Sequence, residues 1–363
     1  GLAGVTVLAG SVLALAVLVA FAHAVWRGCH ALLALAAVLV AAGASSIHFL
    51  ARPHVFSMLL LPASLWLVER DRRHQGHAVW WLVPLSAVWV NLHGGFFALP
   101  ASVGLLAAGL AMEAVWGRAD WAGCRRYSAL CAATLAASVV NPYGTGLHAH
   151  VLRYLTSDWI RNSVDEFQSP RFRSENLLHF ELLLLAALLL AGWWVSRGRL
   201  ADAFLVVGWA HLALASVRHV PLFALVAAPL VAGSLTEGLR NPLGGASPRS
   251  AGRILWELGS ELRPGFGRFS LWGLLLAAGA MLATPPARWP RDFPEAKFPV
   301  SLIRAQQAHL HGRRIFTSDQ WGDYLIYRHW PGQRVFIDGR SDFYGPAVGG
   351  EYLALVEARD GWE

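Results

Sequence analysis

Charged residues are scarce in this chain. Only 15% of its 363 residues are Asp, Glu, Lys or Arg, whereas 55% are hydrophobic and 17 are Trp. Soluble domains typically carry about 25% charged residues. The composition therefore excludes an ordinary soluble enzyme and indicates long uncharged segments that can lie in a membrane.

Cysteine is scarce too, and several catalytic motifs are absent. The three cysteines, Cys29, Cys124 and Cys131, follow no metal-binding spacing, and none falls on the outer face of the topology predicted below. Neither disulfides nor zinc are therefore expected. The sequence contains no GxxxxGK[ST] loop and no GxGxxG after a predicted strand, which leaves ATP-driven work unsupported. It also contains neither a Gly-x-Ser-x-Gly elbow nor an HExxH motif.

Apolar runs make up most of what is present. A bilayer is spanned by about 20 helical residues, and shorter runs must tilt or use flanking residues. We predict a mainly α-helical, polytopic transmembrane bundle over residues 1–284 with about ten spans. The predicted spans are residues 2–26, 30–50, 54–69, 78–92, 95–116, 127–140, 177–196, 202–217, 219–235 and 269–284. Because Gly1 already lies inside an apolar run, we expect the chain to be a fragment that lacks its N-terminus.

The positions of the arginines predict the orientation of these spans. A net charge of +7 could indicate a nucleic-acid partner, but cytoplasmic loops of membrane proteins are also rich in Arg and Lys. Arginines occur in alternate connections, at 27, 70–73, 118–126, 197–199 and 240–268. We therefore expect these connections inside, the turn at 91–95 outside, and no nucleic-acid partner. Only the long connection 141–176 weakens the contrast.

Turn motifs with polar residues gather on the outer face of this topology. They carry Arg52 and His54, Asn91 and His93, Asn141 and Tyr143, Asp165 and Glu166, and Arg218 and His219. Prolines and glycines break the helices at each motif. A purely structural scaffold has no reason to concentrate such residues on one side, so the pattern favours a site at the outer membrane surface.

Plainer explanations exist for the same residues. Arg52 could be a snorkelling side chain at the headgroups, and Asp165 and Glu166 could belong to a solvated loop. The sharper interpretation is a site for a polar substrate attached to a lipid phosphate. Arginine pairs bidentately with phosphate, and carboxylates act as a base or hold a divalent cation. The need for a metal ion is left open.

Three other segments carry predictions of their own. The outer loop 141–176 should contain an interfacial helix over 147–160. The inner stretch from Glu69 to His74 is most simply a solvated cytoplasmic loop. The cytoplasmic loop 236–268 should contain a surface-lying helix, indicated by Ile254, Leu255, Trp256, Leu258 and Leu262.

Residues 285–363 are predicted to form a truncated extracytoplasmic α/β domain. The pattern reads helix (about 300–311), strand (314–317), helix (322–328) and strand (334–337). Asp338, Arg340 and Asp342 follow the second strand. Ligands commonly bind at the carboxyl ends of strands in α/β sheets, so these three residues are a second candidate site.

The motifs together resemble a family of bacterial polytopic proteins grouped with the GT-C glycosyltransferases, which include the mannosyltransferase and aminoarabinose transferase types. The resemblance covers nearly the whole chain. It rests on ARPH at 51–54, NLHGGF at 91–96, NPYG at 141–144, EFQSP at 166–170, RHVPLF at 218–223, WGDYL at 321–325 and VFIDGR at 335–340.

This resemblance implies transfer of a sugar from a polyprenyl-phosphate donor to a glycan, lipid or protein acceptor at the outer face of the bacterial inner membrane. Such enzymes place an essential acid in the first external loop, which here would precede Gly1. Glu166 or Asp165 is then a substitute candidate for the catalytic base. Arg52 and Arg218 would hold the phosphate.

The same resemblance suggests the lining of the site. His54, Asn91 and His93 would line the sugar or carrier site, and Asn141, Tyr143 and His219 complete the predicted substrate-binding set. Two alternatives stay open at this point: a non-catalytic or transport-type protein that binds or passes a lipid-linked glycan, and a sensor or assembly subunit.

Overall fold

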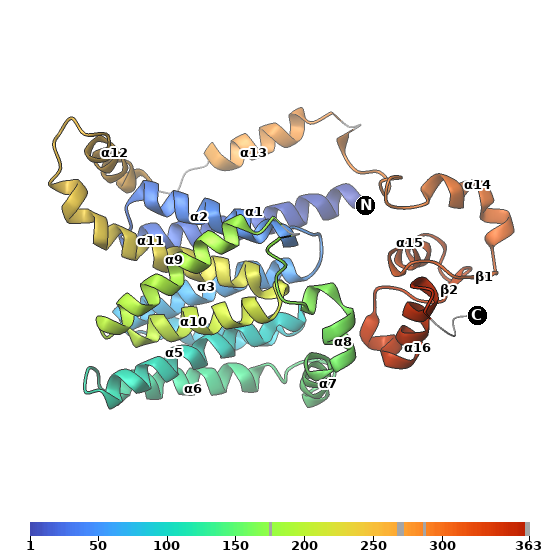
Figure 1. The fold of residues 1–363 in the computed structure, drawn as a ribbon, viewed down its shortest axis with the longest axis horizontal. Coiled ribbons are helices and arrows are strands. Elements are labelled where there is room, and N and C mark those ends of the chain that lie inside the picture. Colours follow the sequence, from blue (N-terminus) through green and yellow to red (C-terminus); the bar gives the residue numbers. More distant parts are fainter. Residues whose placement is uncertain (174–175, 267–271, 286–287, 360–363) are drawn as a thin grey trace. The chain divides into compact units, whose positions relative to one another are not determined.

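The computed structural model describes residues 1–173, 176–266, 272–285 and 288–359. Within these ranges the chain is mainly helical, as the sequence predicts. It divides into two compact units. We call Val7–Ala149 with Glu166–Gly279 the helical bundle, and Gly1–Thr6 with His150–Asp165 and Ala280–Glu363 the second unit (Figure 1).

The bundle is built from long helices joined by short 3₁₀ turns. The helices that lie wholly or mainly in it are α1 (Leu2–Arg27), α2 (Ala31–Ser45), α3 (His54–Arg73), α4 (Leu82–Trp89), α5 (Ala98–Val115), α6 (Trp121–Ala137), α9 (Leu178–Ser196), α10 (Leu200–Ala215), α11 (Val220–Gly244) and α12 (Ala251–Phe266). The turns are η1 (Ser46–His48), η2 (Ala78–Trp81), η3 (Gly94–Phe97), η4 (Asp165–Phe167) and η5 (Val217–His219). Two further helices, α7 (Thr145–Thr156) and α13 (Trp272–Ala283), pass from one unit to the other.

Five helical segments of the described chain are long and apolar enough to cross a membrane, which makes the chain a membrane protein. They are Leu2–Arg27, Ala31–His48, Gly94–Val115, Leu178–Ser196 and Val217–Gly244. Two shorter apolar helices, Ala78–Trp89 and Leu200–Ala215, accompany them.

The expected count of about ten spans is not supported. α4 has 8 residues, and α3 and α6 carry charged residues within their helical turns. Apolar runs that resemble spans in the sequence are in these cases short or charged helices that pack among the longer ones.

Small residues at the contacts allow the helices to approach closely. α11 packs against α2, α3, α9 and α10, and its Ala224, Ala227 and Ala228 are fully buried. Between α5 and α10, a Cβ atom on Gly109 would lie 2.4 Å from the Cα of Ala201, so only glycine permits this crossing. Helix contacts in membranes are enriched in small residues for the same reason.

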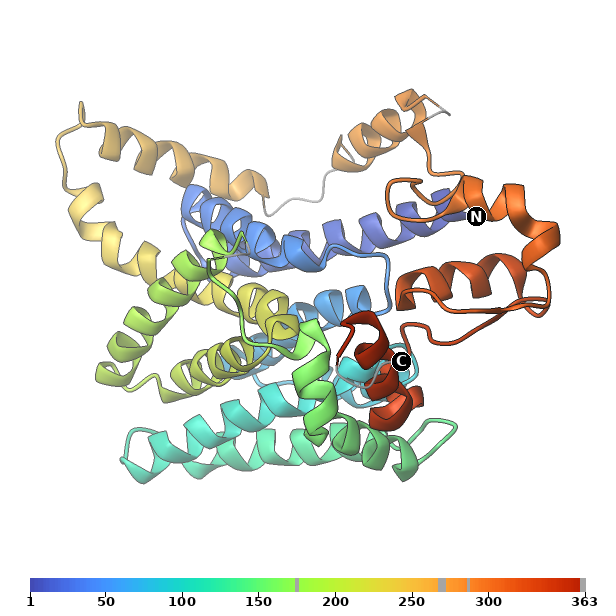
Figure 2. The ribbon, with the colours of Figure 1, turned by 45° about the vertical axis from the view of Figure 1, so that its right-hand side comes forward.

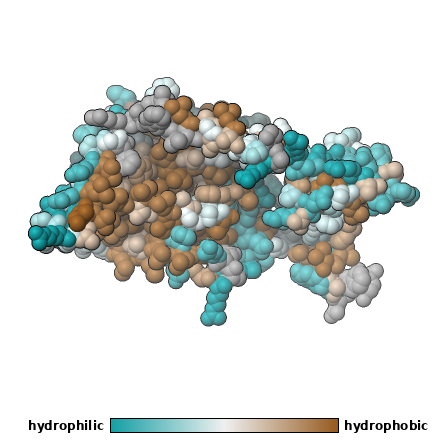
Figure 3. All heavy atoms as spheres, turned by 90° about the horizontal axis from the view of Figure 1, so that it is seen from above, coloured by the Kyte–Doolittle hydropathy of each residue, from teal (hydrophilic) through white to brown (hydrophobic). Residues whose placement is uncertain are grey.

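The outside of the bundle is strongly apolar. α5 and α6 lie side by side in both ribbon views (Figures 1 and 2), and the bundle exposes a broad hydrophobic surface (Figure 3). Leu18, Leu39 and Leu189 are among the exposed side chains. Lipid tails are as apolar as leucine, so these side chains suit a bilayer better than water.

The second unit contains α8 (Asp158–Ser163), α14 (Val300–Leu310), β1 (Arg314–Ile315), α15 (Asp319–His329), β2 (Arg334–Val335) and α16 (Ser341–Val356). The predicted order of helix, strand, helix and strand is present, and β1 pairs with β2 in parallel. Each strand has only 2 residues, however, so the predicted α/β domain is not supported. The unit is instead a helical assembly with one short strand pair, and its small core contains Ile303, Tyr324 and Leu325.

Two predicted loops contain more helix than expected. The helix predicted over 147–160 is broken in two, because Ser157 caps the start of α8 and α7 ends at Thr156. In the stretch 236–268, α11 continues to Gly244 and α12 follows as a separate amphipathic helix.

Candidate functional site

The structure brings several of the predicted outer turns together at one end of the bundle, which we call the turn end. It comprises the connections 46–54, 90–97, 138–144, 166–170 and 216–219. The amide of Asn91 donates a hydrogen bond to the Val140 carbonyl, with a distance of 2.8 Å. The backbone N–H of Val217 donates to the Gln168 carbonyl at 2.9 Å. Because these bonds join residues far apart in the sequence, the polar motifs share one surface.

Arg52 and Glu166 form an ion pair at the turn end. Arg52 Nη1 lies 2.7 Å from Glu166 Oε1, and the two side chains are 61% and 38% exposed. Exposed ion pairs contribute only about 0–1 kcal/mol to stability. Arg52 is thus already partnered, and an incoming anion could displace Glu166 from it at little cost.

Arg218 is held in a different way. Its guanidinium carbon lies 4.4 Å from the centre of the Phe167 ring. Within the part of the chain that the structure describes, Arg218 forms no ion pair. Stacking fixes the plane of a guanidinium while its N–H groups stay free to donate. Arg218 is therefore the better placed of the two arginines to bind an anion.

His93 is oriented by a chain of hydrogen bonds. Nε1 of the buried Trp89 donates to Ser57 Oγ at 2.8 Å, and Ser57 Oγ lies 2.7 Å from His93 Nδ1. The N–H of Gly95 also donates to His93 Nδ1, at 3.1 Å. A backbone N–H can only donate, so His93 Nδ1 is an acceptor, and in the neutral ring Nε2 carries the proton.

The surroundings of His93 favour its neutral form. Burial, the guanidinium of Arg218 and the ring of His54 lower the pKa of His93 to about 4, against a smaller opposing effect of Glu166. At neutral pH His93 is therefore uncharged and presents an N–H donor at Nε2. Gly95 makes room for this ring, because a Cβ atom there would lie 2.7 Å from His93 Nδ1.

The other two predicted histidines of the turn end bond to backbone carbonyls. His54 Nε2 donates to the His48 carbonyl at 2.7 Å, and His219 Nδ1 donates to the Leu212 carbonyl at 3.2 Å. The rings of His54 and His93 lie 6.4 Å apart between centroids. Among the described residues, two buried ring nitrogens at this end have no hydrogen-bond partner, Nδ1 of His48 and Nδ1 of His148, whose Nε2 bonds to Ser138. The turn end thus combines fixed rings with unsatisfied polar atoms.

Asn91, Asn141 and Tyr143 serve the turns themselves. Asn91 bonds to the Ala87 and Val140 carbonyls. Asn141 donates to the Ser138 and Gly144 carbonyls and accepts from the N–H of Tyr143. The Tyr143 ring is 75% exposed. The side chains of Asn91 and Asn141 therefore fix the shape of the turns, whereas Tyr143 contributes its backbone N–H and leaves its side chain exposed.

The acidic candidates differ in their placement. Glu166 belongs to the bundle, whereas Asp165, its neighbour in η4, is assigned to the second unit. Among the residues that the structure describes, no three His, Cys, Asp or Glu side chains lie together as metal ligands.

Asp338, Arg340 and Asp342 lie in the second unit as separate pairs. Arg340 binds Asp338 bidentately, with Nε–Oδ1 and Nη2–Oδ2 distances of 2.8 and 2.5 Å, and the Tyr344 hydroxyl donates to Asp338 Oδ2 at 2.8 Å. Although burial raises the pKa of Asp338, its hydrogen bonds from Arg340 and Tyr344 outweigh this and hold the pKa below its usual range. Asp342 contacts His150 at 3.1 Å. Asp338 is thus a saturated structural anchor.

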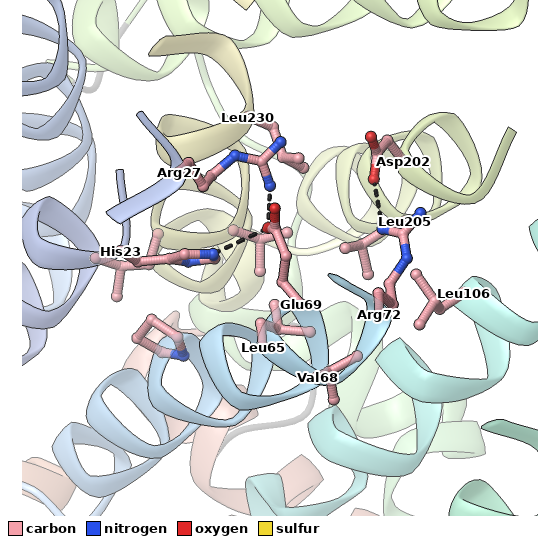
Figure 4. A pocket seen from close by; sticks show the side chains of 13 residues that line it. His23, Arg27, Leu65, Val68, Glu69, Arg72, Leu106, Asp202, Leu205 and Leu230 are labelled. Atoms are coloured by element: carbon pink, nitrogen blue, oxygen red, sulfur yellow. Dashed lines mark hydrogen bonds and ion pairs between the residues drawn. The ribbon is translucent and has the colours of Figure 1, made fainter. Parts of the chain in front are cut away.

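A buried charge network at the opposite end of the bundle was not predicted. The stretch from Glu69 to His74 is not a solvated loop, because α3 continues to Arg73. Glu69 accepts hydrogen bonds from His23 and Arg27 of α1, and Asp202 of α10 accepts from Arg72 at 2.9 Å (Figure 4). We call the end of the bundle that contains this network the basic end. The sequence signal was the spacing of Glu69 and Arg72, which places both on one helix face.

The network surrounds a small cavity. It has a volume of about 30 Å³ and is lined by His23, Arg27, Glu69, Arg72 and Asp202 together with apolar side chains. A water molecule needs about 10–15 Å³ by this measure, so the cavity has room for about two. A substrate the size of a sugar does not fit in this cavity. We therefore assign the network a structural role.

Asp71 forms a second buried cluster at the basic end. Arg126 binds it bidentately at 2.8 Å, and the hydroxyl of Tyr127 donates to it at 2.8 Å. Burial raises the pKa of Asp71, but these bonds and the Gly76 N–H outweigh it, so the pKa lies below its usual range. α3 and α6 are joined through this carboxylate.

The two ends of the bundle thus differ in kind, with saturated ion pairs at the basic end and available donors at the turn end. No protein-family model, curated protein or solved structure matches the chain. The GT-C resemblance therefore rests on the motifs alone.

Proposed function

We propose that the chain is an integral membrane glycosyltransferase that moves a sugar from a polyprenyl-phosphate donor to a glycan, lipid or protein acceptor. The observation that carries the proposal is the grouping of Arg218, Arg52, His93 and Glu166 at one end of a bundle of membrane-spanning helices. The distribution of arginines favours a bacterial inner membrane protein whose turn end and second unit face outward.

Arg218 is the primary phosphate contact in this proposal. The phosphate of a polyprenyl carrier lies at the membrane surface, at the height where the spans Ala31–His48 and Val217–Gly244 begin or end. A stacked, planar guanidinium with free N–H groups can donate two parallel hydrogen bonds to two oxygens of a phosphate. His93 Nε2 adds a neutral donor, which stabilises negative charge on the leaving phosphate without a competing positive partner.

In the proposed reaction the donor phosphate replaces Glu166 as the partner of Arg52. When the donor phosphate binds, it draws Arg52 away from Glu166 and leaves the carboxylate free to act as a base. Glu166 then accepts the proton of the acceptor hydroxyl, and the hydroxyl oxygen forms a bond to the anomeric carbon. The bond from that carbon to the phosphate oxygen breaks with inversion, and the polyprenyl phosphate leaves with the electron pair.

A second candidate function is binding or passage of a lipid-linked glycan without transfer. It is favoured by one observation, the ion pair that engages Glu166 with Arg52. While this pair is intact, the Glu166 carboxylate is engaged with a guanidinium and not with an acceptor hydroxyl. In this case the same arginines would bind the carrier phosphate, and no sugar would leave the lipid.

The experiment uses the chain reconstituted in nanodiscs with polyprenyl phosphates that carry a radiolabelled sugar. Transfer is measured as label that leaves the lipid extract, and binding as lipid that stays with the purified protein. Arg218→Ala should lower transfer by about 10- to 100-fold, the cost of a lost charged hydrogen bond. Arg52→Ala should also lower it.

Arg118→Ala is the matched control. Arg118 also stacks on an aromatic ring, Trp116, at 5.3 Å, but it lies at the basic end. Its variant should transfer at the normal rate. Bound lipid without transfer would favour the second function. If Arg218→Ala binds and transfers as the unchanged protein does, the proposal is wrong.

A further inference from the structure

α12 has three distinct faces. With about 100° of rotation per residue, Gly252, Trp256 and Gly259 lie on one face. Ile254, Leu255, Leu258 and Leu262 form a second face, and Arg253, Glu257, Ser260 and Glu261 form a third. The four apolar side chains of the second face are all exposed, from 40% to 53%. This is a large exposed apolar face for a helix whose packing is already complete on another side.

The first face packs against the bundle and fixes the position of α12 beside His30. The Trp256 ring stacks on His30 with centroids 4.4 Å apart, and His30 Nε2 donates to the Trp256 carbonyl at 2.8 Å. A Cβ atom on Gly259 would lie 2.1 Å from the His30 ring, so glycine is required there. Figure 2 shows α12 beside the N-terminal end of α2.

His30 marks the point where two spans end. It lies between the span that ends at Arg27 and the span that begins at Ala31. A helix fixed to His30 therefore lies at the level of the membrane surface, where one side can face water and another the hydrocarbon.

Exposed arginines flank the apolar face along the chain. Arg240 and Arg249 precede α12, and Arg263 lies in its last turn, on the bundle side of the helix beside Gly28. Basic residues next to a membrane are attracted to anionic headgroups. An amphipathic helix with apolar residues on one side and arginines around it is the usual form of an interfacial helix.

We infer that α12 lies in the headgroup layer at the basic end, with Leu255 and Leu258 among the acyl chains and the arginines on anionic headgroups. This inference does not depend on the proposed function, because it concerns the opposite end of the bundle. α12 thereby holds the junction of α1 and α2 at a fixed depth.

The test uses nitroxide labels on the full chain in vesicles of phosphatidylcholine and phosphatidylglycerol. Cys124 and Cys131 are replaced, whereas the buried Cys29 is retained. Labels at Leu255→Cys and Leu258→Cys should be accessible to oxygen and protected from a water-soluble nickel chelate. A label at Glu261→Cys, on the polar face, should show the reverse.

Two outcomes overturn the inference. If labels at 255 and 258 are open to the nickel chelate, the face lies in water. If they are protected from both reagents, protein covers the face instead, for example a second copy of the chain. In vesicles of phosphatidylcholine alone, protection from nickel should weaken, and unchanged protection would contradict the role of anionic headgroups.

Discussion

The hydroxyl oxygen of Ser57 lies 2.7 Å from Nδ1 of His93 and accepts a hydrogen bond from the buried indole of Trp89. This single hydroxyl links α3, the end of α4 and the turn before α5. It sets the direction of the His93 ring, and through the ring it sets the position of an N–H donor at the turn end.

Ser57→Ala should reduce binding of a polyprenyl phosphate by about 5-fold, the effect of losing about 1 kcal/mol of orienting hydrogen bond. It should also lower stability, because Trp89 Nε1 loses its acceptor. Ser234→Ala is the matched control, since Trp194 Nε1 donates to Ser234 Oγ at 2.8 Å and Ser234 Oγ donates in turn to the Leu230 carbonyl. Both variants should lose stability in thermal unfolding, but only Ser57→Ala should lose lipid binding. Equal lipid binding by the two variants would show that Ser57 does not position His93.

Gly95→Ala should displace His93. The added Cβ atom would lie 2.7 Å from His93 Nδ1 and 2.9 Å from Ser57 Oγ, and both contacts are too short to persist. Gly94→Ala adds the same methyl group where no atom lies within 4 Å. We expect lipid-phosphate binding to fall for Gly95→Ala and to stay unchanged for Gly94→Ala, measured by titration in nanodiscs. A loss in both variants would mean that flexibility of the turn, and not the space beside His93, is what matters.

Asp202→Asn should strongly destabilise the bundle. Asp202 is 5% exposed and pairs with Arg72 and Arg199, so its removal leaves two guanidiniums near a buried site. Breaking a buried ion pair costs about 3–5 kcal/mol. Glu237→Gln is the control, because Glu237 is half exposed and its arginine contacts are 3.7 and 3.8 Å. Its change should cost less than about 1 kcal/mol. Thermal unfolding in detergent compares the two, and similar midpoints would contradict the burial of the network.

The low pKa of His93 predicts a pH dependence. The unfolded ring has a pKa near 6.5, whereas the folded ring has a pKa of about 4. Between these values the unfolded state binds more protons than the folded state, so stability rises with pH from about 4 to about 6.5. The contribution of His93 is fully present above about 6.5 and is lost as the pH falls towards 4. The difference in unfolding midpoint between the unchanged protein and His93→Asn should follow this course. A difference that is constant over the window would exclude the assigned protonation state.

Much of the general class could be predicted from composition and spacing. Low charge and long apolar runs predicted a helical membrane protein, because an uncharged helix of sufficient length has few other stable environments. In the described residues five helical segments, and not about ten, have the length and apolarity of a span, because an apolar run alone does not show whether its helix is short or ends in charged residues. α3 is a case of the second kind, since its 20 residues end in charged side chains that contact α1 and α10.

The turn motifs were readable as turns, because proline and glycine act locally on the backbone. The sequence did not show, however, which of their polar residues stabilise the turns and which present donors to a ligand. Asn91 and Asn141 stabilise turns, whereas Arg218 and His93 present donors, and the difference depends on which distant segment lies opposite each side chain. No short-range pattern carries that information.

The sequence by itself determined the membrane class, the helical content and the places where the chain turns, because these follow from hydrophobicity and local backbone preference. Only the tertiary structure decided that Ser57 orients His93, that Arg52 is paired with Glu166, and that the charges from Glu69 to Arg72 are buried. Each of these depends on helices far apart in the chain that meet at a few ångströms, where burial and hydrogen bonding change the chemistry of a side chain.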